Sequence, residues 1–282
     1  IHEADWLGHL TKLEFPIFHS KGNRESLAYL DTAATAQRLG CAIEAQNIFD
    51  SYENANVYRG AYKLSADANA YFEDARRQIE TCIGSTSMST ILTTNATASL
   101  NLVVQAWGTQ NVHEGDIVAV SAGEHHSNFL SWMCLCERIG AHLVRIPIKG
   151  DGRIDMDAYA KILEQKPKIV CVAQISNVLG MLNPVKEMAE MAHAAGARSL
   201  VDAAQSAPHV GIDVKDLGVD FLSFASHKMY GPLGVGGLWV APEAFEEMDP
   251  LICGGGAVSH VGHHTYYLRE GAIQYELGTP PI

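Results

Sequence analysis

Lys228 and Asp202 are the two side chains of this 282-residue sequence whose types and positions most clearly suggest chemistry. Lys228 follows the apolar run 221–225 and precedes a Gly-Pro turn, and Asp202 ends the run 199–202. Both runs are typical of buried strands, and ligand crevices in open α/β sheets lie outside the carboxyl ends of such strands. A lysine amine can form a Schiff base with an aldehyde, and a carboxylate can hold a pyridinium nitrogen protonated. The pair therefore predicts a pyridoxal 5′-phosphate (PLP) site, although either residue alone would more often be structural or solvated.

Predicted strands and helices alternate along the chain and must position these two residues. Apolar runs bounded by turn residues predict strands at 90–94, 116–121, 142–147, 169–174, 198–202, 221–224 and 236–240. Helical periodicity predicts helices at 98–107, 128–139, 156–165 and 184–195. This alternation indicates a mostly parallel, mixed sheet with helices on both faces, a three-layer α/β/α architecture. The strand at 236–240 follows a tight Gly/Pro turn and is expected to run antiparallel as a hairpin partner.

The composition of the chain excludes several classes of function. It is 47% hydrophobic with a formal net charge of −12, which argues against nucleic acid or an anionic membrane as the main partner. No apolar run approaches the roughly 20 residues that span a bilayer, and the N-terminus lacks a signal-peptide pattern. The six scattered cysteines indicate reduced thiols in a cytoplasmic protein. Cys134 and Cys136 lie two apart in a predicted helix and face different sides of it, so packing is expected there and no metal site is predicted.

The start of the first predicted helix and a pair of histidines supply further candidates. Ala96 and Thr97 begin the helix that runs to Trp107, so their backbone N–H groups point at a site that favours an anion. The Thr97 hydroxyl adds a donor and is expected to be the helix N-cap, and a plain cap without a ligand is the open alternative. His125 and His126 follow a predicted strand end, which favours a functional role for His125 and leaves His126 as the structural candidate.

A series of motifs between Tyr29 and Pro280 resembles class V, fold-type-I PLP enzymes, and most closely group II (SufS-type) cysteine desulfurases and selenocysteine lyases. In chain order they are YLDTAAT at 29–35, NVYRG at 56–60, TTNAT at 93–97, EHHSN at 124–128, SNVLG at 176–180, VDAAQ at 201–205, SHKMYGP at 226–232, GGG at 254–256 and ELGTP at 276–280. One such motif would be weak support. Their number and order make the resemblance strong, and the double histidine favours group II.

The resemblance implies PLP as the cofactor and gives each matching residue a role. Lys228 corresponds to the Schiff-base lysine, which also moves the proton at the substrate Cα, and His125 to the imidazole stacked on the cofactor ring. Asp202 corresponds to the partner of the pyridinium nitrogen, and Gln205 to the residue that hydrogen-bonds the cofactor's phenolic oxygen. The remaining matches are phosphate ligands and substrate contacts: Ala96, Thr97, Ser226, His227 and, reaching the other subunit, Thr279 for phosphate; Ala33 and Asn177 for substrate.

Three departures from the family pattern stand out. The family has a serine three residues before the lysine, where this chain has Ala225. Ser226 could substitute, although a one-residue shift in an extended segment points a side chain the other way. Tyr58 stands where the family has a histidine near the substrate, which weakens a proton-transfer role at that position.

The third departure concerns the family's C-terminal small domain. It adds roughly another hundred residues, with the nucleophilic cysteine and the carboxylate-binding arginine, and this chain ends at Ile282 without a matching cysteine. We therefore expect residues 26–282 to form the PLP-binding large domain, with the C-terminal small domain absent, and residues 1–25 to belong to the small domain.

The activity implied by the resemblance is that of a PLP-dependent cysteine desulfurase. Such an enzyme removes sulfur from L-cysteine, or selenium from L-selenocysteine, and leaves L-alanine and a persulfide for sulfur transfer, as in iron–sulfur cluster assembly. The resemblance also implies a homodimer with two shared active sites and a sulfur-acceptor protein as partner. Two alternatives stay open: another class V PLP enzyme (an aminotransferase, epimerase or lyase), or a truncated, non-catalytic PLP-binding protein.

Overall fold

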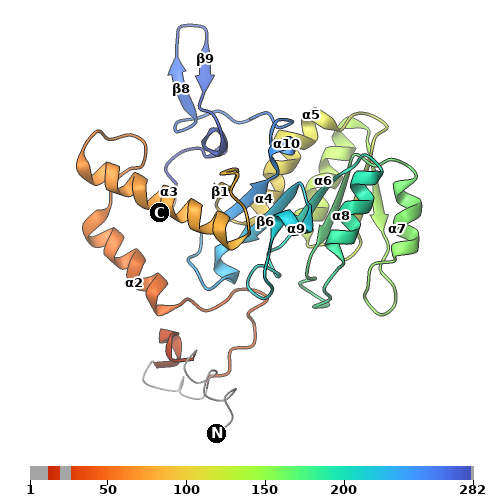
Figure 1. The fold of residues 1–282 in the computed structure, drawn as a ribbon, viewed down its shortest axis with the longest axis horizontal. Helices are drawn as coiled ribbons and strands as arrows, with labels where there is room; N and C mark the ends of the chain where they lie inside the picture. The colour runs from red at the N-terminus through yellow and green to blue at the C-terminus, as the bar shows by residue number, and fades with distance from the viewer. Residues whose placement is uncertain (1–11, 20–26, 281–282) are drawn as a thin grey trace.

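The computed structural model describes residues 12–19 and 27–280 and is built around one seven-stranded sheet (Figure 1). The strand order is β1-β7-β6-β5-β4-β2-β3. The strands are β1 Ile91–Thr93, β2 Ile117–Ser121, β3 His142–Ile146, β4 Ile169–Ala173, β5 Arg198–Asp202, β6 Phe221–Ala225 and β7 Gly236–Val240. Strand β7 pairs antiparallel with β1 and β6, and the other neighbours pair in parallel. This confirms the mostly parallel, mixed sheet and its predicted antiparallel strand.

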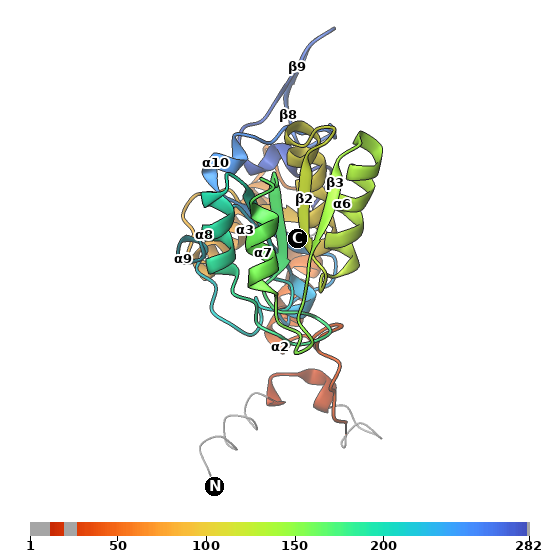
Figure 2. The same ribbon diagram turned by 90° about the vertical axis from the view of Figure 1, so that its right-hand side faces the viewer.

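Helices cover both faces of the sheet (Figure 2). Helices α7 Met156–Leu163, α8 Val185–Ala194 and α9 Val214–Leu217 lie over one face, and α4 Ala96–Val103 and α6 His126–Ile139 lie over the other. Successive side chains of a strand point to opposite faces, so Leu200 of β5 packs in the core under α4 and α6. The next residue, Val201, packs in the core under α7 and α8. The three-layer architecture predicted from the alternation is confirmed.

The start of α4 differs from the prediction. The helix begins at Ala96, and its N-cap is Asn95, whose side chain accepts a hydrogen bond from the Ala98 N–H at 2.9 Å. The prediction that Thr97 caps this helix is therefore wrong. The turn after β1 is only two residues long, so the helix starts before Thr97, whose N–H already lies in the first turn. After Val103 the helix continues as a π-helical turn, Val104–Gly108.

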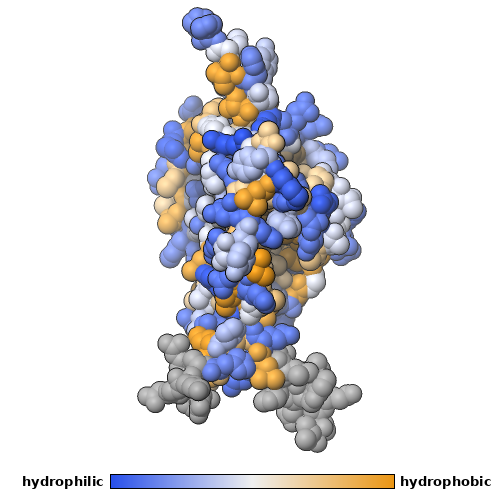
Figure 3. All heavy atoms as spheres, turned by 90° about the vertical axis from the view of Figure 1, so that its left-hand side faces the viewer, coloured by the Kyte–Doolittle hydropathy of each residue, from blue (hydrophilic) through white to orange (hydrophobic). Residues whose placement is uncertain are grey.

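Several elements outside the sheet were not predicted. Helix α3, Lys63–Cys82, buries a stripe at helical spacing that includes Ala68, Phe72, Arg76 and Glu80. A hairpin of β8 Val258–Val261 and β9 Tyr266–Leu268 projects away from the rest of the fold (Figures 1 and 3). The remaining elements are the helices α2 Gly40–Ile48, α5 Thr109–Asn111 and α10 Pro242–Phe245, the π-helical turn Phe49–Glu53, and the 3₁₀ turns Pro16–His19, Ser226–Lys228 and Ala272–Tyr275.

A buried ion pair fastens α3 to the last described segment. Arg76, whose side chain is 3% exposed, donates from its two Nη atoms to the two carboxylate oxygens of Glu276 at 2.6 and 2.9 Å. Arg76 also donates to the Thr90 carbonyl, and Glu276 Oε1 accepts the Leu92 N–H at 2.7 Å. The pair therefore joins α3, β1 and the segment that leads to Thr279.

Little of the N-terminal segment can be assigned to a domain. Residues 12–19 are described, and there the Phe15 ring meets the Tyr230 ring at 5.7 Å between centroids. The rest of the segment 1–25 lies outside the described residues, so its membership of the small domain stays a prediction. In the described part of the chain, no helix has both the length and the apolar character of a membrane span.

Candidate active site

A cavity of about 190 Å³ opens at one edge of the sheet. Strands β1, β2, β4, β5 and β6 run in the same direction, and the segments that follow them meet at this edge, as expected for a ligand crevice in such a sheet. The cavity is lined by Ala34, Asn95, Ala96, Thr97, Leu100, His125, Ser127, Ala173, Ile175, Asn177, Asp202, Ala204, Gln205, Ala225, His227 and Lys228. Most residues singled out in the sequence are therefore brought together.

Asp202 lines the cavity from the end of β5, and Lys228 lines it from the turn after the neighbouring strand β6. Asp202 ends β5, is 6% exposed, and accepts the Ala204 N–H at 2.9 Å. Burial raises the pKa of Asp202, and the Ala204 N–H and the positive charge of Lys228 partly oppose this rise. Burial lowers the pKa of Lys228, and the charge of Asp202 opposes that change. The amine is thus more readily neutral and nucleophilic than an exposed lysine, and the buried carboxylate would be stabilised by a cation brought beside it.

The start of α4 forms one end of the cavity. Ala96 and Thr97 lie in the uncovered first turn, where backbone N–H groups and the helix dipole favour an anion. The strand β7 passes closely beneath this turn, because a Cβ at Gly236 would lie 2.6 Å from the Asn95 backbone. Only glycine allows that approach. His227 also lines the cavity, and burial, with the nearby charge of Lys228, lowers its pKa, which favours the neutral imidazole.

His125 stands at the N-cap of α6, where its Nδ1 accepts the Ser127 N–H at 3.1 Å. The residue before it, Glu124, fixes this turn to the neighbouring strand. Glu124 Oε1 accepts the Ala173 N–H, and Oε2 accepts from Asn128 Nδ2, both at 2.7 Å. Burial raises the pKa of Glu124 to about 8, and the negative charge of Asp202 adds to the rise. The imidazole is therefore carried by a turn that is hydrogen-bonded to the end of β4.

Gln205 and Asn177 line the same cavity, whereas Ala33 is not among its lining residues. Gln205 Nε2 donates to the Ala33 carbonyl at 2.7 Å, which ties the segment 33–34 to the turn after β5. Ala34 lines the cavity, and Ala33 takes part through its carbonyl. Asn177 lines the cavity from the segment that follows β4.

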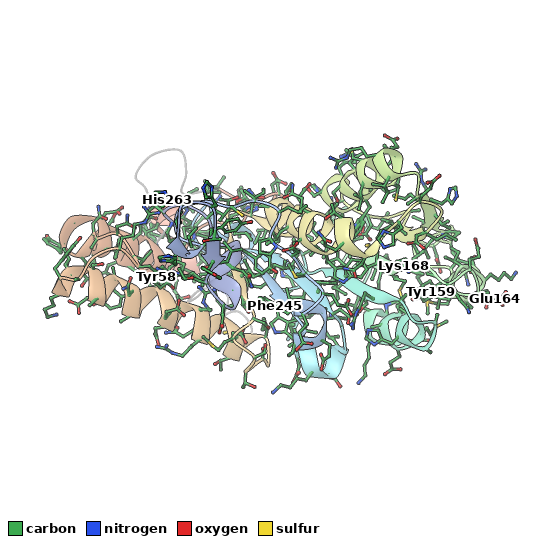
Figure 4. The ribbon with its side chains drawn as sticks, turned by 90° about the horizontal axis from the view of Figure 1, so that it is seen from above. Tyr58, Tyr159, Glu164, Lys168, Phe245 and His263 are labelled. Atoms are coloured by element: carbon green, nitrogen blue, oxygen red, sulfur yellow. The ribbon has the colours of Figure 1, made fainter. Side chains whose placement is uncertain are left out.

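Two predicted cofactor residues are not placed in this cavity. Ser226 points elsewhere: a Cβ at Gly231 would overlap the Ser226 hydroxyl, and Ala225 lines the cavity instead. Thr279 lines a separate cavity of about 490 Å³ beside β1 and α4. Tyr58 also lies apart, at the α3 end of the molecule and far from Tyr159 of α7 (Figure 4). Its hydroxyl donates to Glu73, and its ring contacts Phe72.

Sequence reasoning missed three residues that shape the site. Asn95 is a preferred N-cap type directly before a helix, so its signal was present in the sequence. Ser127 and Glu124 lie in the EHHSN motif beside the predicted histidine, but their roles depend on contacts with Thr97 and Ala173 in other elements. Those contacts have no local sequence signal. The described cysteines are all free, and Cys134 is exposed while Cys136 is buried, as their spacing predicts.

Comparisons of this chain with protein families, curated proteins and solved structures agree with one another. The aminotransferase class-V family matches residues 28–282. A probable cysteine desulfurase of Halalkalibacterium halodurans is 41% identical over 275 residues, which cover 97% of this chain and 68% of the relative. A cysteine desulfurase of an Enterobacter species is 38% identical, with 95% and 67% covered. The apo structure of the cysteine desulfurase from Thermococcus onnurineus matches with a TM-score of 0.90 at 33% identity, covering 96% of this chain and 66% of that one. The chain spans about two thirds of the length of these relatives.

Proposed function

Because this chain belongs to the class-V aminotransferase family, among the cysteine desulfurases, we propose that it catalyses PLP-dependent removal of sulfur from L-cysteine. The products would be L-alanine and a persulfide on the thiol that attacks the substrate sulfur, which the family carries in its C-terminal small domain. L-selenocysteine is the corresponding selenium substrate. One observation carries the proposal: Lys228, Asp202 and His125 line a single cavity at the carboxyl edge of the sheet. The curated relatives that are 37% and 41% identical to this chain are named cysteine desulfurase and probable cysteine desulfurase.

The residues around the cavity fit PLP. Lys228 supplies an amine for the cofactor aldehyde, and Asp202 a buried carboxylate for a cationic ring nitrogen. The anion-favouring first turn of α4 and the neutral His227 suit a phosphate. When bound, PLP supplies the electron sink for bond cleavage at the substrate Cα. These groups thus match the aldehyde, the ring nitrogen and the phosphate of the cofactor, and all of them line one cavity.

This chain's own residues would bind the substrate and move protons. The Lys228 amine would take the proton from the substrate Cα, and its lowered pKa suits a base. Asn177 would bind the substrate carboxylate from the mouth of the cavity. His125 would supply a second proton-transfer group.

We propose a second copy of the chain as the partner in a dimer. A sulfur-acceptor protein would receive the persulfide sulfur. No residue of α2 is buried, and Tyr52 and Tyr71 nearby are 80% and 50% exposed. Together with the cavity beside Thr279, these surfaces suit an isologous dimer that shares its sites. A solution mass of one chain at micromolar concentration would contradict this. The free cysteines support a reducing, cytoplasmic location.

The test of the activity is to supply PLP, L-cysteine and a thiol reductant such as dithiothreitol, which releases the persulfide sulfur as sulfide, and to measure alanine and sulfide. We expect both products in equal amounts without any keto acid. Turnover that requires a keto-acid acceptor would instead assign an aminotransferase. The exposed Cys253 offers a control, because the family does not use that position: Cys253→Ser should leave the product ratio unchanged.

A further inference from the structure

His125 has two tasks that constrain each other, since it lines the cavity and also caps α6. A helix N-cap must offer an acceptor to a backbone N–H of the first turn. His125 does so through Nδ1, which accepts the Ser127 N–H at 3.1 Å. A backbone N–H can only donate, so Nδ1 carries its lone pair, and the proton of the neutral ring lies on Nε2.

The Ser127 hydroxyl extends this contact to a second helix. Its Oγ lies 2.9 Å from His125 Nδ1 and 2.7 Å from Thr97 Oγ1. Because Nδ1 is an acceptor, the Ser127 hydroxyl donates its one proton to it. The Ser127 oxygen is then left to accept the Thr97 hydroxyl. Two hydroxyls therefore link the imidazole at the start of α6 to the anion-favouring turn of α4.

We propose that Ser127 is a positioning residue that holds His125 as its Nε2–H tautomer and ties the ring to Thr97. A neutral imidazole in this form can donate a hydrogen bond from Nε2 but cannot accept one there. His125 would thus meet a molecule in the cavity as a proton donor. The importance of this for catalysis rests on the proposed function, whereas the tautomer itself does not.

The tautomer can be measured in the cofactor-free protein. Nitrogen-15 labelling of histidine and long-range nitrogen–proton correlation show which ring nitrogen carries the proton, at a pH where the ring is neutral. We expect His125 to be mainly Nε2–H. Ser127→Ala removes one of two donors to Nδ1 and should lower the ratio of Nε2–H to Nδ1–H roughly fivefold. Ser127→Thr keeps the hydroxyl and should keep the ratio.

Ser131→Ala is the matched control, because it removes a hydroxyl one turn further along α6. Ser131 Oγ donates to the Ser127 carbonyl at 2.8 Å and does not line the cavity. This variant should leave the His125 ratio unchanged, and circular dichroism checks that each variant folds. A wild-type ring that is mainly Nδ1–H would overturn the proposal. An unchanged ratio in Ser127→Ala would overturn it as well.

A second measurement separates this inference from the proposed function. Titration with PLP should show weaker binding for Ser127→Ala than for Ser131→Ala, read from the visible absorption of the bound cofactor. If wild type binds no PLP while its tautomer is as expected, the proposed function fails and the role of Ser127 in holding His125 stands. If PLP binds but the tautomer ratio is the same in wild type and Ser127→Ala, the positioning role fails alone.

Discussion

Replacing Glu124 by glutamine should change how the stability of the cofactor-free protein depends on pH. The pKa of Glu124 is raised from 4.5 to about 8 because its carboxyl is buried beside Asp202. Between these two values the folded protein binds more protons than the unfolded chain, so unfolding becomes easier as the pH rises. The stabilisation that the protonated Glu124 contributes is complete below pH 4.5 and is lost as the pH rises through 8. Glu124→Gln keeps the shape of the neutral acid and does not titrate.

The size of the effect follows from that shift. A pKa difference of 8 − 4.5 = 3.5 corresponds to an upper limit of about 5 kcal/mol in the free energy of unfolding. Relaxation of the surroundings and entry of water beside a buried charge reduce this limit, and we expect about 2 kcal/mol. The Ala173 N–H can still donate to the glutamine oxygen, and the Asn128 amide can turn to accept from its nitrogen. The variant should therefore match wild type near pH 5 and exceed it near pH 9 by about that amount.

The assay is urea unfolding of wild type and variant at a series of pH values, followed by circular dichroism. The difference between the two proteins cancels the titrating groups that do not interact with Glu124, and Asp202 is the neighbour whose charge does. The same substitution at the exposed Glu114 controls for the loss of one negative charge. A difference between wild type and Glu124→Gln that stays constant over the whole range would refute the raised pKa.

Three further single variants and one double variant test the site and the ion pair that supports it. Lys228→Ala should fold normally but lose the visible absorption that wild type gains with PLP, and a retained band would place the covalent link elsewhere. Asp202→Asn should keep that absorption and slow alanine formation by about two orders of magnitude or more, because the ring nitrogen loses its counter-charge. An undiminished rate would make Asp202 only a strand-end residue. Arg76→Met should cost about 3–5 kcal/mol in urea unfolding, since it leaves the Glu276 carboxylate buried without its partner. Arg76→Met together with Glu276→Met should recover much of that loss, and no recovery would argue against the pair.

Much of the fold could be predicted because the strands of a parallel sheet are buried on both faces. Their apolar runs stand out between turn residues, and the strands at 198–202 and 236–240 were predicted to the residue. Helix α3 was not predicted because its buried stripe includes Arg76 and Glu80. Charged residues at these positions are typical of a solvent-exposed helix face and do not indicate a buried one. The hairpin of β8 and β9 is largely exposed and lacks an alternating core pattern.

The candidate site was predicted to the extent that it follows strand ends. Asp202 ends β5, Lys228 and His125 lie in the short turns that follow β6 and β2, and the topology brings those strand ends to one edge. The position of Ser226 depends on the close approach of Gly231 to its hydroxyl. The cap of α4 depends on the close approach of Gly236 to the Asn95 backbone. Such contacts join residues far apart in the sequence. They become visible only in three dimensions.

The place of β1 at the sheet edge has a consequence for how the protein folds during its synthesis on the ribosome. The strand β1 is the first of the sheet to be made, yet its neighbour is β7, the last, with Ile91 opposite Leu238. Pairings between residues so distant in sequence form slowly, because the entropy of closing a long loop is lost before the contacts contribute any stabilising free energy. The Asn95 turn rests on Gly236 of that late strand. The anion-favouring turn of the cavity should therefore be completed only after β7 has emerged, late in the synthesis of the described chain.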